Sequence, residues 1–148
     1  MSSAYCRFAP GDPTHDRYHN TEYGFPTAEE SVLFERLILE INQAGLSWAT
    51  ILKKRAALRA AYADFAVDQL AAFGTVQMER LLVDPGIIRN RLKIEAAAEN
   101  ARRIQALRQS HGSFALWLAT HHPRSPRSGR SSSAGRFALP AAKSSVNF

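Results

Sequence analysis

The stretch TAEESVLFERLILEINQAGLSW, residues 27–48, decides the fold class of this chain. Its apolar side chains recur every three or four residues, which is the spacing of one face of an α-helix. Thr27 and Glu30 match the capping box that begins a helix, and Gly45 is typical of a helix end. The apolar stripe consists of Leu33, Phe34, Leu37, Ile38, Ile41 and Ala44. The sequence therefore predicts a buried helix from Thr27 to Ala44.

Further helices are predicted on the C-terminal side of this stretch. Ser47 is a suitable N-cap for a helix that starts at Trp48 and ends near Tyr62. Asp84-Pro85-Gly86 breaks the helical pattern before a long alanine-rich helix. The remaining helices are expected at 67–73, 75–82, 88–107 and 114–119. No segment alternates as a strand does, so we expect an all-α body.

The N-terminal residues and the bulk composition add little to this picture. Residues 1–26 contain three prolines and show little periodicity, so we expect a mostly extended arm. A length of 148 residues favours one domain. No apolar run is long enough for a membrane span or a signal peptide. The single cysteine, Cys6, excludes an internal disulfide and fits a cytoplasmic protein, which we expect to be a monomer.

The composition changes at Pro123. Residues 1–122 read as the helical domain, whereas residues 123–148 contain seven serines and four arginines without any acidic residue. Such a segment is typical of a disordered basic tail. The tail also supplies most of the net charge of +6, because residues 1–123 hold 14 basic and 13 acidic side chains. The global charge is therefore no argument for DNA binding by the body.

Three motifs carry a resemblance to a known family. They are YHNTEYGFP at 18–26, LEINQAGLSW at 39–48 continuing through ILKKR at 51–55, and GIIRNR at 86–91. With these motifs the chain resembles the 3-methyladenine DNA glycosylase I family, within the helix-hairpin-helix DNA glycosylases. The resemblance implies a monofunctional enzyme of base excision repair. It would hydrolyse the N-glycosidic bond of N3-methyladenine in damaged double-stranded DNA, taking the base out of the duplex.

The resemblance also implies which residues read the base. Glu40 would be the catalytic residue, because its charge favours a cationic methylated base over neutral adenine. Tyr18, Trp48 and Tyr23 would stack on that base, although the family commonly has Trp at the position of Tyr23. A solvated helix glutamate and ordinary core packing of the aromatic residues are the alternatives.

DNA contacts are expected at two places. Gly45 and Leu46, between two helices, would form a wedge that fills the gap left by the extruded base. Residues 81–100 would form the helix-hairpin-helix, in which Gly86 permits positive φ and the next helix offers free N–H groups to a phosphate. The cations expected near DNA are Lys53, Lys54, Arg55, Arg59, Arg89, Arg91 and Lys93. Solvated helix faces are the alternative for these clusters.

The sequence departs from the family at its C-terminal end. Cys6 and His19 match half of the family's zinc site, but no cysteine follows residue 6, so we expect neither a stable zinc nor another cofactor. A shifted reading frame of residues 127–148 can encode a string similar to the family's C-terminal helical segment. We therefore expect a frameshift near residue 126 that truncates the chain. A DNA-binding fragment with an incomplete base pocket, or a pseudogene product without a partner, remain the alternative functions.

Overall fold

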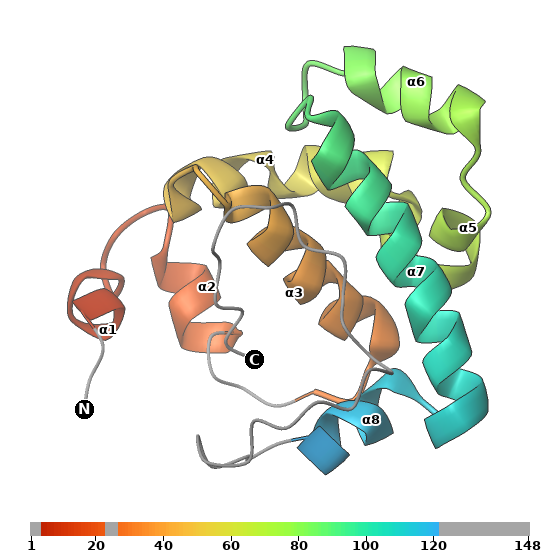
Figure 1. The fold of residues 1–148 in the computed structure, drawn as a ribbon. Helices are drawn as coiled ribbons and strands as arrows, with labels where there is room; N and C mark the ends of the chain where they lie inside the picture. The colour runs from red at the N-terminus through yellow and green to blue at the C-terminus, as the bar shows by residue number, and fades with distance from the viewer. Residues whose placement is uncertain (1–3, 23–26, 122–148) are drawn as a thin grey trace.

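The computed structural model describes residues 4–22 and 27–121, and within them it contains helices and no strands (Figure 1). The predicted all-α class is thereby confirmed. The predicted tail at 123–148 lies outside the described residues. The elements are α1 (Ala4–Phe8), α2 (Asp16–Thr21), α3 (Glu30–Gln43), α4 (Trp48–Ala61), η1 (Ala63–Phe65), α5 (Val67–Ala71), α6 (Thr75–Val83), α7 (Arg91–His111) and α8 (Phe114–His121).

The core is built around α3, which packs against α4, α7, α5 and α8 (Figure 1). The predicted stripe is the reason, because Leu33, Phe34, Leu37, Ile38 and Ile41 are all buried. Burial of each such side chain contributes about 1.5–3 kcal/mol to folding. The helix predicted from the apolar spacing is therefore confirmed as the central element.

The long helix α7 holds several other helices together. It packs against α5, α6, α3 and α8. At its C-terminal end, Arg108 makes a bidentate pair with Glu30 at the start of α3 and donates to Asp68 of α5 at 2.7 Å. Carboxylates at the first turn of a helix also compensate its positive N-terminal end. This ion-pair cluster thus fixes three helices at one corner.

The helix starts differ from the predictions in three places. The arm predicted as extended contains α1 and α2. At the start of α2, Asp16 accepts hydrogen bonds from the Gly11 N–H at 2.8 Å and the Asn20 side chain at 2.9 Å. The capping box at Thr27 is wrong, since α3 begins at Glu30 with Glu29 as its N-cap. The helix α7 begins at Arg91, later than expected.

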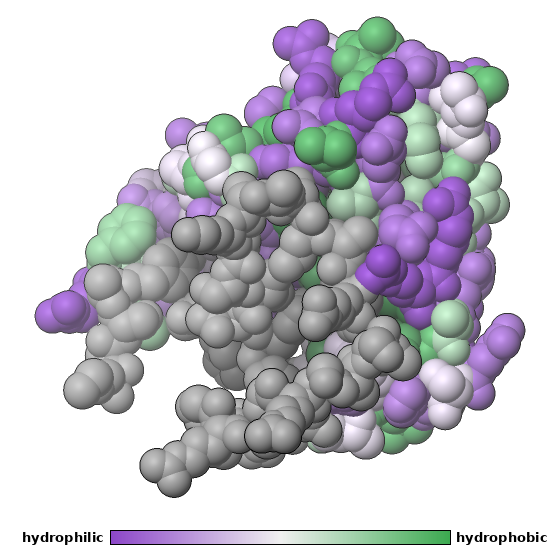
Figure 2. Space-filling view, viewed as in Figure 1, coloured by the Kyte–Doolittle hydropathy of each residue, from purple (hydrophilic) through white to green (hydrophobic). Residues whose placement is uncertain are grey.

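Where Figure 2 leaves the described residues uncovered, they form no large apolar region. There, hydrophilic and hydrophobic side chains alternate over α6 and α7. Val76 and Val83 on α6 and Leu92 on α7 are exposed apolar residues of this kind. Within the described ranges, no helix is both long and apolar enough to cross a membrane.

Candidate active site

The turn between α3 and α4 is a tightly hydrogen-bonded corner with an exposed tip. Gly45 follows the end of α3, as predicted, and has a φ of +80°, which favours glycine. The Leu46 N–H donates to the Gln43 carbonyl at 2.8 Å, and the Gln43 amide donates back to the Leu46 carbonyl at 3.1 Å. Ser47 then caps α4 by accepting from the Thr50 N–H at 3.2 Å, which confirms that prediction. The Leu46 side chain is 36% exposed at the tip of this rigid turn.

Lys93 lies beneath the same turn and is buried. Its ammonium donates to the carbonyl of Asn42 at 2.7 Å and to that of Ala44 at 2.6 Å. These carbonyls end α3, where a cation is favoured by the helix dipole. Burial lowers the pKa of Lys93. Lys93 was predicted to contact DNA, but the structure places its ammonium inside the protein, where it closes the C-terminal end of α3.

Tyr18 and Trp48 meet at this corner from two different helices. Their ring centroids lie 5.3 Å apart with an interplanar angle of 61°, an edge-to-face pair. Trp48 is the first residue of α4, and Tyr18 comes from α2, far away in the sequence. The structure thus brings together two of the three aromatic residues predicted to hold the base. The third, Tyr23, lies outside the described residues.

Glu40 stands in the last turn of α3, just before this corner. It is half-buried, and burial raises the pKa of its carboxyl above the ordinary value of 4.5. No hydrogen bond or ion pair to Glu40 is found within residues 4–22 and 27–121. A partly desolvated carboxylate without a counter-charge favours a cationic ligand. The catalytic role of Glu40 stays a prediction, with which this partial burial is compatible.

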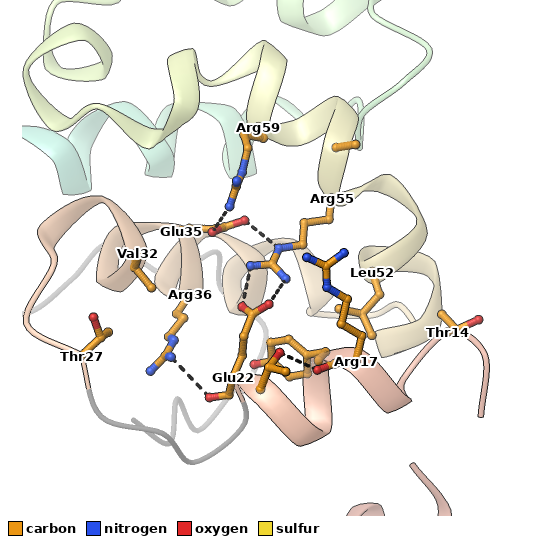
Figure 3. A pocket seen from close by; sticks show the side chains of 13 residues that line it. Thr14, Arg17, Glu22, Thr27, Val32, Glu35, Arg36, Leu52, Arg55 and Arg59 are labelled. Atoms are coloured by element: carbon orange, nitrogen blue, oxygen red, sulfur yellow. Dashed lines mark hydrogen bonds and ion pairs between the residues drawn. The ribbon is translucent and has the colours of Figure 1, made fainter. Parts of the chain in front are cut away.

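A cleft of about 700 Å³ opens beside this corner, between α2, α3 and α4 (Figure 3). Tyr18 lines it, whereas Glu40 and Trp48 do not, so this cleft is distinct from the predicted base site. An ion-pair chain crosses it. Arg55 donates to both oxygens of Glu22 at 2.7 and 2.6 Å and to Glu35 at 2.7 Å. Arg59 donates to the other oxygen of Glu35, also at 2.7 Å.

Two cations of α4 that were predicted to lie near DNA belong to this ion-pair chain. Arg55 and Arg59 both point toward the carboxylate of Glu35, which is 2% exposed, although the side chain of Arg59 is itself 51% exposed. Burial alone would raise the pKa of Glu35, yet the hydrogen bonds and charges of Arg55 and Arg59 outweigh it and lower that pKa. Glu22 and Glu35 raise the pKa of Arg55 despite its partial burial. Sequence reasoning had not singled out Glu22 or Glu35.

The segment between α6 and α7 forms the predicted hairpin. The Gly86 N–H donates to the Asp84 carboxylate at 2.7 Å, and Asn90 caps α7 by accepting from the Lys93 N–H at 3.2 Å. Gly86 does not adopt a positive φ, so that expectation is wrong. The reason for glycine is close packing on α4, since an added Cβ would lie 3.0 Å from the Cβ of Ala57.

The cations predicted around this hairpin divide into two groups. Lys54 donates to the carbonyls of Pro85 and Gly86, each at 3.4 Å, so it joins α4 to the hairpin. Arg91 pairs with Glu79 at 3.3 Å on the surface, where such pairs contribute little. Lys53 and Arg89 are exposed and make no hydrogen bond or ion pair with any residue that the structure describes. These two side chains are available to bind phosphate.

The comparison with protein families identifies this arrangement. A family model described as methyladenine glycosylase matches residues 8–146, which is most of the chain. This chain belongs to the methyladenine glycosylase family. The match runs past residue 123, into the predicted tail, so the domain boundary there stays a prediction.

Individual members of the methyladenine glycosylase family agree with this assignment. DNA-3-methyladenine glycosylase 1 of Escherichia coli is 40% identical over 119 residues, which are 79% of this chain and 64% of that protein. The Haemophilus influenzae DNA-3-methyladenine glycosylase is 36% identical over 107 residues, 71% of this chain and 58% of that protein. The chain thus spans less than two thirds of these relatives.

Solved structures of the family share the fold. A structure of 3-methyladenine DNA glycosylase I from Staphylococcus aureus has a TM-score of 0.74 at 35% identity, covering 81% of this chain and 64% of that chain. A variant of 3-methyladenine DNA glycosylase I in complex with 3-methyladenine also has a TM-score of 0.74, at 36% identity and covering 78% of this chain and 62% of that chain.

The zinc ligands predicted from the family pattern are Cys6 and His19. His19 donates a hydrogen bond from its Nδ1 to the side-chain oxygen of Asn20 at 2.9 Å. This bond and one with Cys6 raise the pKa of His19, so the two predicted ligands lie close together. Across the described ranges, no three potential ligands gather in a group that could hold a metal ion. A structural zinc needs four ligands. These residues alone therefore do not fit the metal.

Proposed function

We propose that this chain is a monofunctional DNA glycosylase that releases N3-methyladenine from alkylated double-stranded DNA. The observation that carries the proposal is the half-buried carboxylate of Glu40, which has no counter-charge in the described structure and lies in the last turn of α3, before the turn that leads to Trp48. A methylated purine in DNA carries a positive charge. It therefore gains both from the carboxylate and from the aromatic faces, the latter by about 2 kcal/mol when desolvated.

The reaction needs little help from the protein. Water attacks the C1′ atom of the sugar, the N-glycosidic bond breaks, and its electron pair neutralises the positive charge of the departing base. The proton of the attacking water passes to solvent. Because the leaving group is already cationic, binding and positioning can supply most of the catalysis. Leu46, at its rigid and exposed turn, would occupy the space of the extruded base.

Base release from methylated duplex DNA tests the proposal directly. We expect release by the whole chain, and a loss of about 100-fold in Glu40→Gln, similar to the loss of one electrostatic stabiliser elsewhere. Glu99→Gln, a change of the same kind on α7, is the control. Since burial raises the pKa of Glu40, release should also decline on acidification at a higher pH than 4.5, the ordinary value. Equal release by Glu40→Gln and the control would overturn the assignment.

A second candidate function is DNA binding without base release. Its support is that the chain spans 64% of the length of the E. coli relative. In addition, Lys53 and Arg89 are exposed. DNA retention without release, weakened in Arg89→Ala, would favour it. In either case we propose a cytoplasmic monomer that holds no stable zinc, supported by the incomplete ligand set.

A further inference from the structure

Arg55 connects its own helix α4 with α3 and with the C-terminal end of α2. It belongs to α4, two turns after Trp48. Its two terminal nitrogens donate to both oxygens of Glu22, directly after α2, and its Nε donates to Glu35 of α3. Figure 3 shows this arginine between the two carboxylates. A fork of this kind fixes geometry as well as supplying attraction.

The same guanidinium also lies over the ring of Tyr18, 5.9 Å from its centroid. Tyr18 in turn meets Trp48 edge to face at 5.3 Å. The helix α2 that carries Tyr18 has only six residues and no side-chain N-cap. So short a helix is not stable by itself and depends on tertiary contacts for its position. The pair with Glu22 is such a contact, at the end of α2 that follows Tyr18.

We propose that Arg55 is a positioning residue: through Glu22 and the Tyr18 ring, it holds α2 so that Tyr18 stays against Trp48 in the base site. The proposal rests on the proposed function for its catalytic consequence, but not for its geometry. Arg55 touches neither the base nor the reacting atoms. Its effect on catalysis is therefore indirect, through the placement of an aromatic wall.

The neighbouring Arg59 makes a matched control. It stands one turn further along α4 and binds the same carboxylate of Glu35 at 2.7 Å, but it is half-exposed and contacts neither Glu22 nor Tyr18 in any interaction of the described structure. If the ion-pair chain had a purely structural role, Arg55→Lys and Arg59→Lys would differ only in stability. The proposal requires that the surroundings of the Trp48 ring change in Arg55→Lys but not in Arg59→Lys.

The first experiment measures geometry in the ligand-free protein. The indole N–H of Trp48 is followed by NMR, and Trp117 of α8, the other tryptophan of the chain, is the internal reference. Tyr18→Leu gives the signal expected when the ring is absent. In Arg55→Lys, which keeps the charge but loses the fork, the Trp48 signal should move toward that of Tyr18→Leu. It should stay in place in Arg59→Lys, and Trp117 should stay in place in both.

The second experiment measures kinetics of base release. Arg55→Lys should lower kcat/KM about tenfold or more, mainly through KM, because a displaced wall weakens base binding. Glu22→Gln should lower kcat/KM by a similar factor. The double variant Glu22→Gln/Arg55→Lys should have a kcat/KM little lower than that of either single variant. Glu35→Gln should reduce stability while the Trp48 signal keeps its position.

If the Trp48 signal is unchanged in Arg55→Lys, the positioning role is refuted, whether or not the chain releases base. If the signal moves but the wild-type chain releases no base, only the proposed function fails.

Discussion

Replacing Lys93 by methionine separates a structural cation from a DNA-binding one. Methionine keeps most of the length and volume of lysine but removes the ammonium. The variant leaves the carbonyls of Asn42 and Ala44 without their donors, which lie at 2.7 and 2.6 Å in the native protein. The perturbation therefore acts on the end of α3 and on the turn that leads to Trp48.

The magnitude follows from those two hydrogen bonds. Each charge-assisted bond contributes about 1.5–3 kcal/mol, so their loss costs about 3–6 kcal/mol before compensation. The variant recovers the cost of desolvating the ammonium, a cost that also lowers the pKa of Lys93. We expect a net decrease of about 2–4 kcal/mol in the free energy of unfolding, because removing one buried partner leaves the other unsatisfied.

Urea unfolding measures this change, with the exposed Lys53→Met as the control. A second assay follows DNA retention against salt concentration. Loss of one phosphate contact lowers the slope of log K against log salt by about 0.9. Lys53→Met should lower this slope and leave the free energy of unfolding unchanged. Lys93→Met should lower the free energy of unfolding and leave the slope unchanged. A Lys93→Met protein that is as stable as the wild type, or that loses one phosphate contact, would refute the reasoning.

Two further changes test other contacts. Gly86→Ala should lower the free energy of unfolding, measured by thermal unfolding, by about 1–3 kcal/mol, because the new methyl would lie 3.0 Å from the Cβ of Ala57. Adding Ala57→Gly to this variant should restore part of the lost stability. If it restores none, the steric explanation is wrong. The pKa of Glu35 is lowered in the folded state, so its carboxylate stabilises the fold above the pKa of the unfolded state, and this stabilisation is lost as the pH falls through the pKa of the folded state. The stability of the wild type should therefore fall more steeply on acidification than that of Glu35→Gln. Equal dependence of stability on pH in the two proteins would contradict this.

Local sequence patterns predicted the elements whose stability is decided locally. The spacing of apolar residues from Leu33 to Ile41 fixed the buried face of α3, because no other orientation of that helix buries the whole stripe. Ser47 was identified as a cap because its hydroxyl accepts from a backbone N–H only three residues away. The short helix α2 escaped prediction because polar contacts such as those of Asp16 stabilise it, and it has no apolar periodicity of its own.

The sequence did contain a signal that Lys93 and Arg55 turn toward the interior of the protein. On α7, Lys93 is in register with Ala97, Asn100 and Ile104, which are all buried, at the spacing of one helical face. On α4, Arg55 stands in the same way between Ile51 and Leu58. A charge in the middle of an apolar stripe indicates a buried partner. The identity of that partner could not be read, since it depends on how the helices pack.

The division of these cations explains why a family motif cannot assign DNA contacts by itself. The motifs ILKKR and GIIRNR place basic residues next to one another in the sequence, yet neighbouring positions on a helix point in different directions. Arg55 consequently joins three helices, while Lys53, two residues earlier, is exposed. A buried cation that lost its partner would be costly, whereas an exposed one can exchange water and ions for a phosphate. Burial, and not membership of the motif, therefore decides which charges can meet DNA.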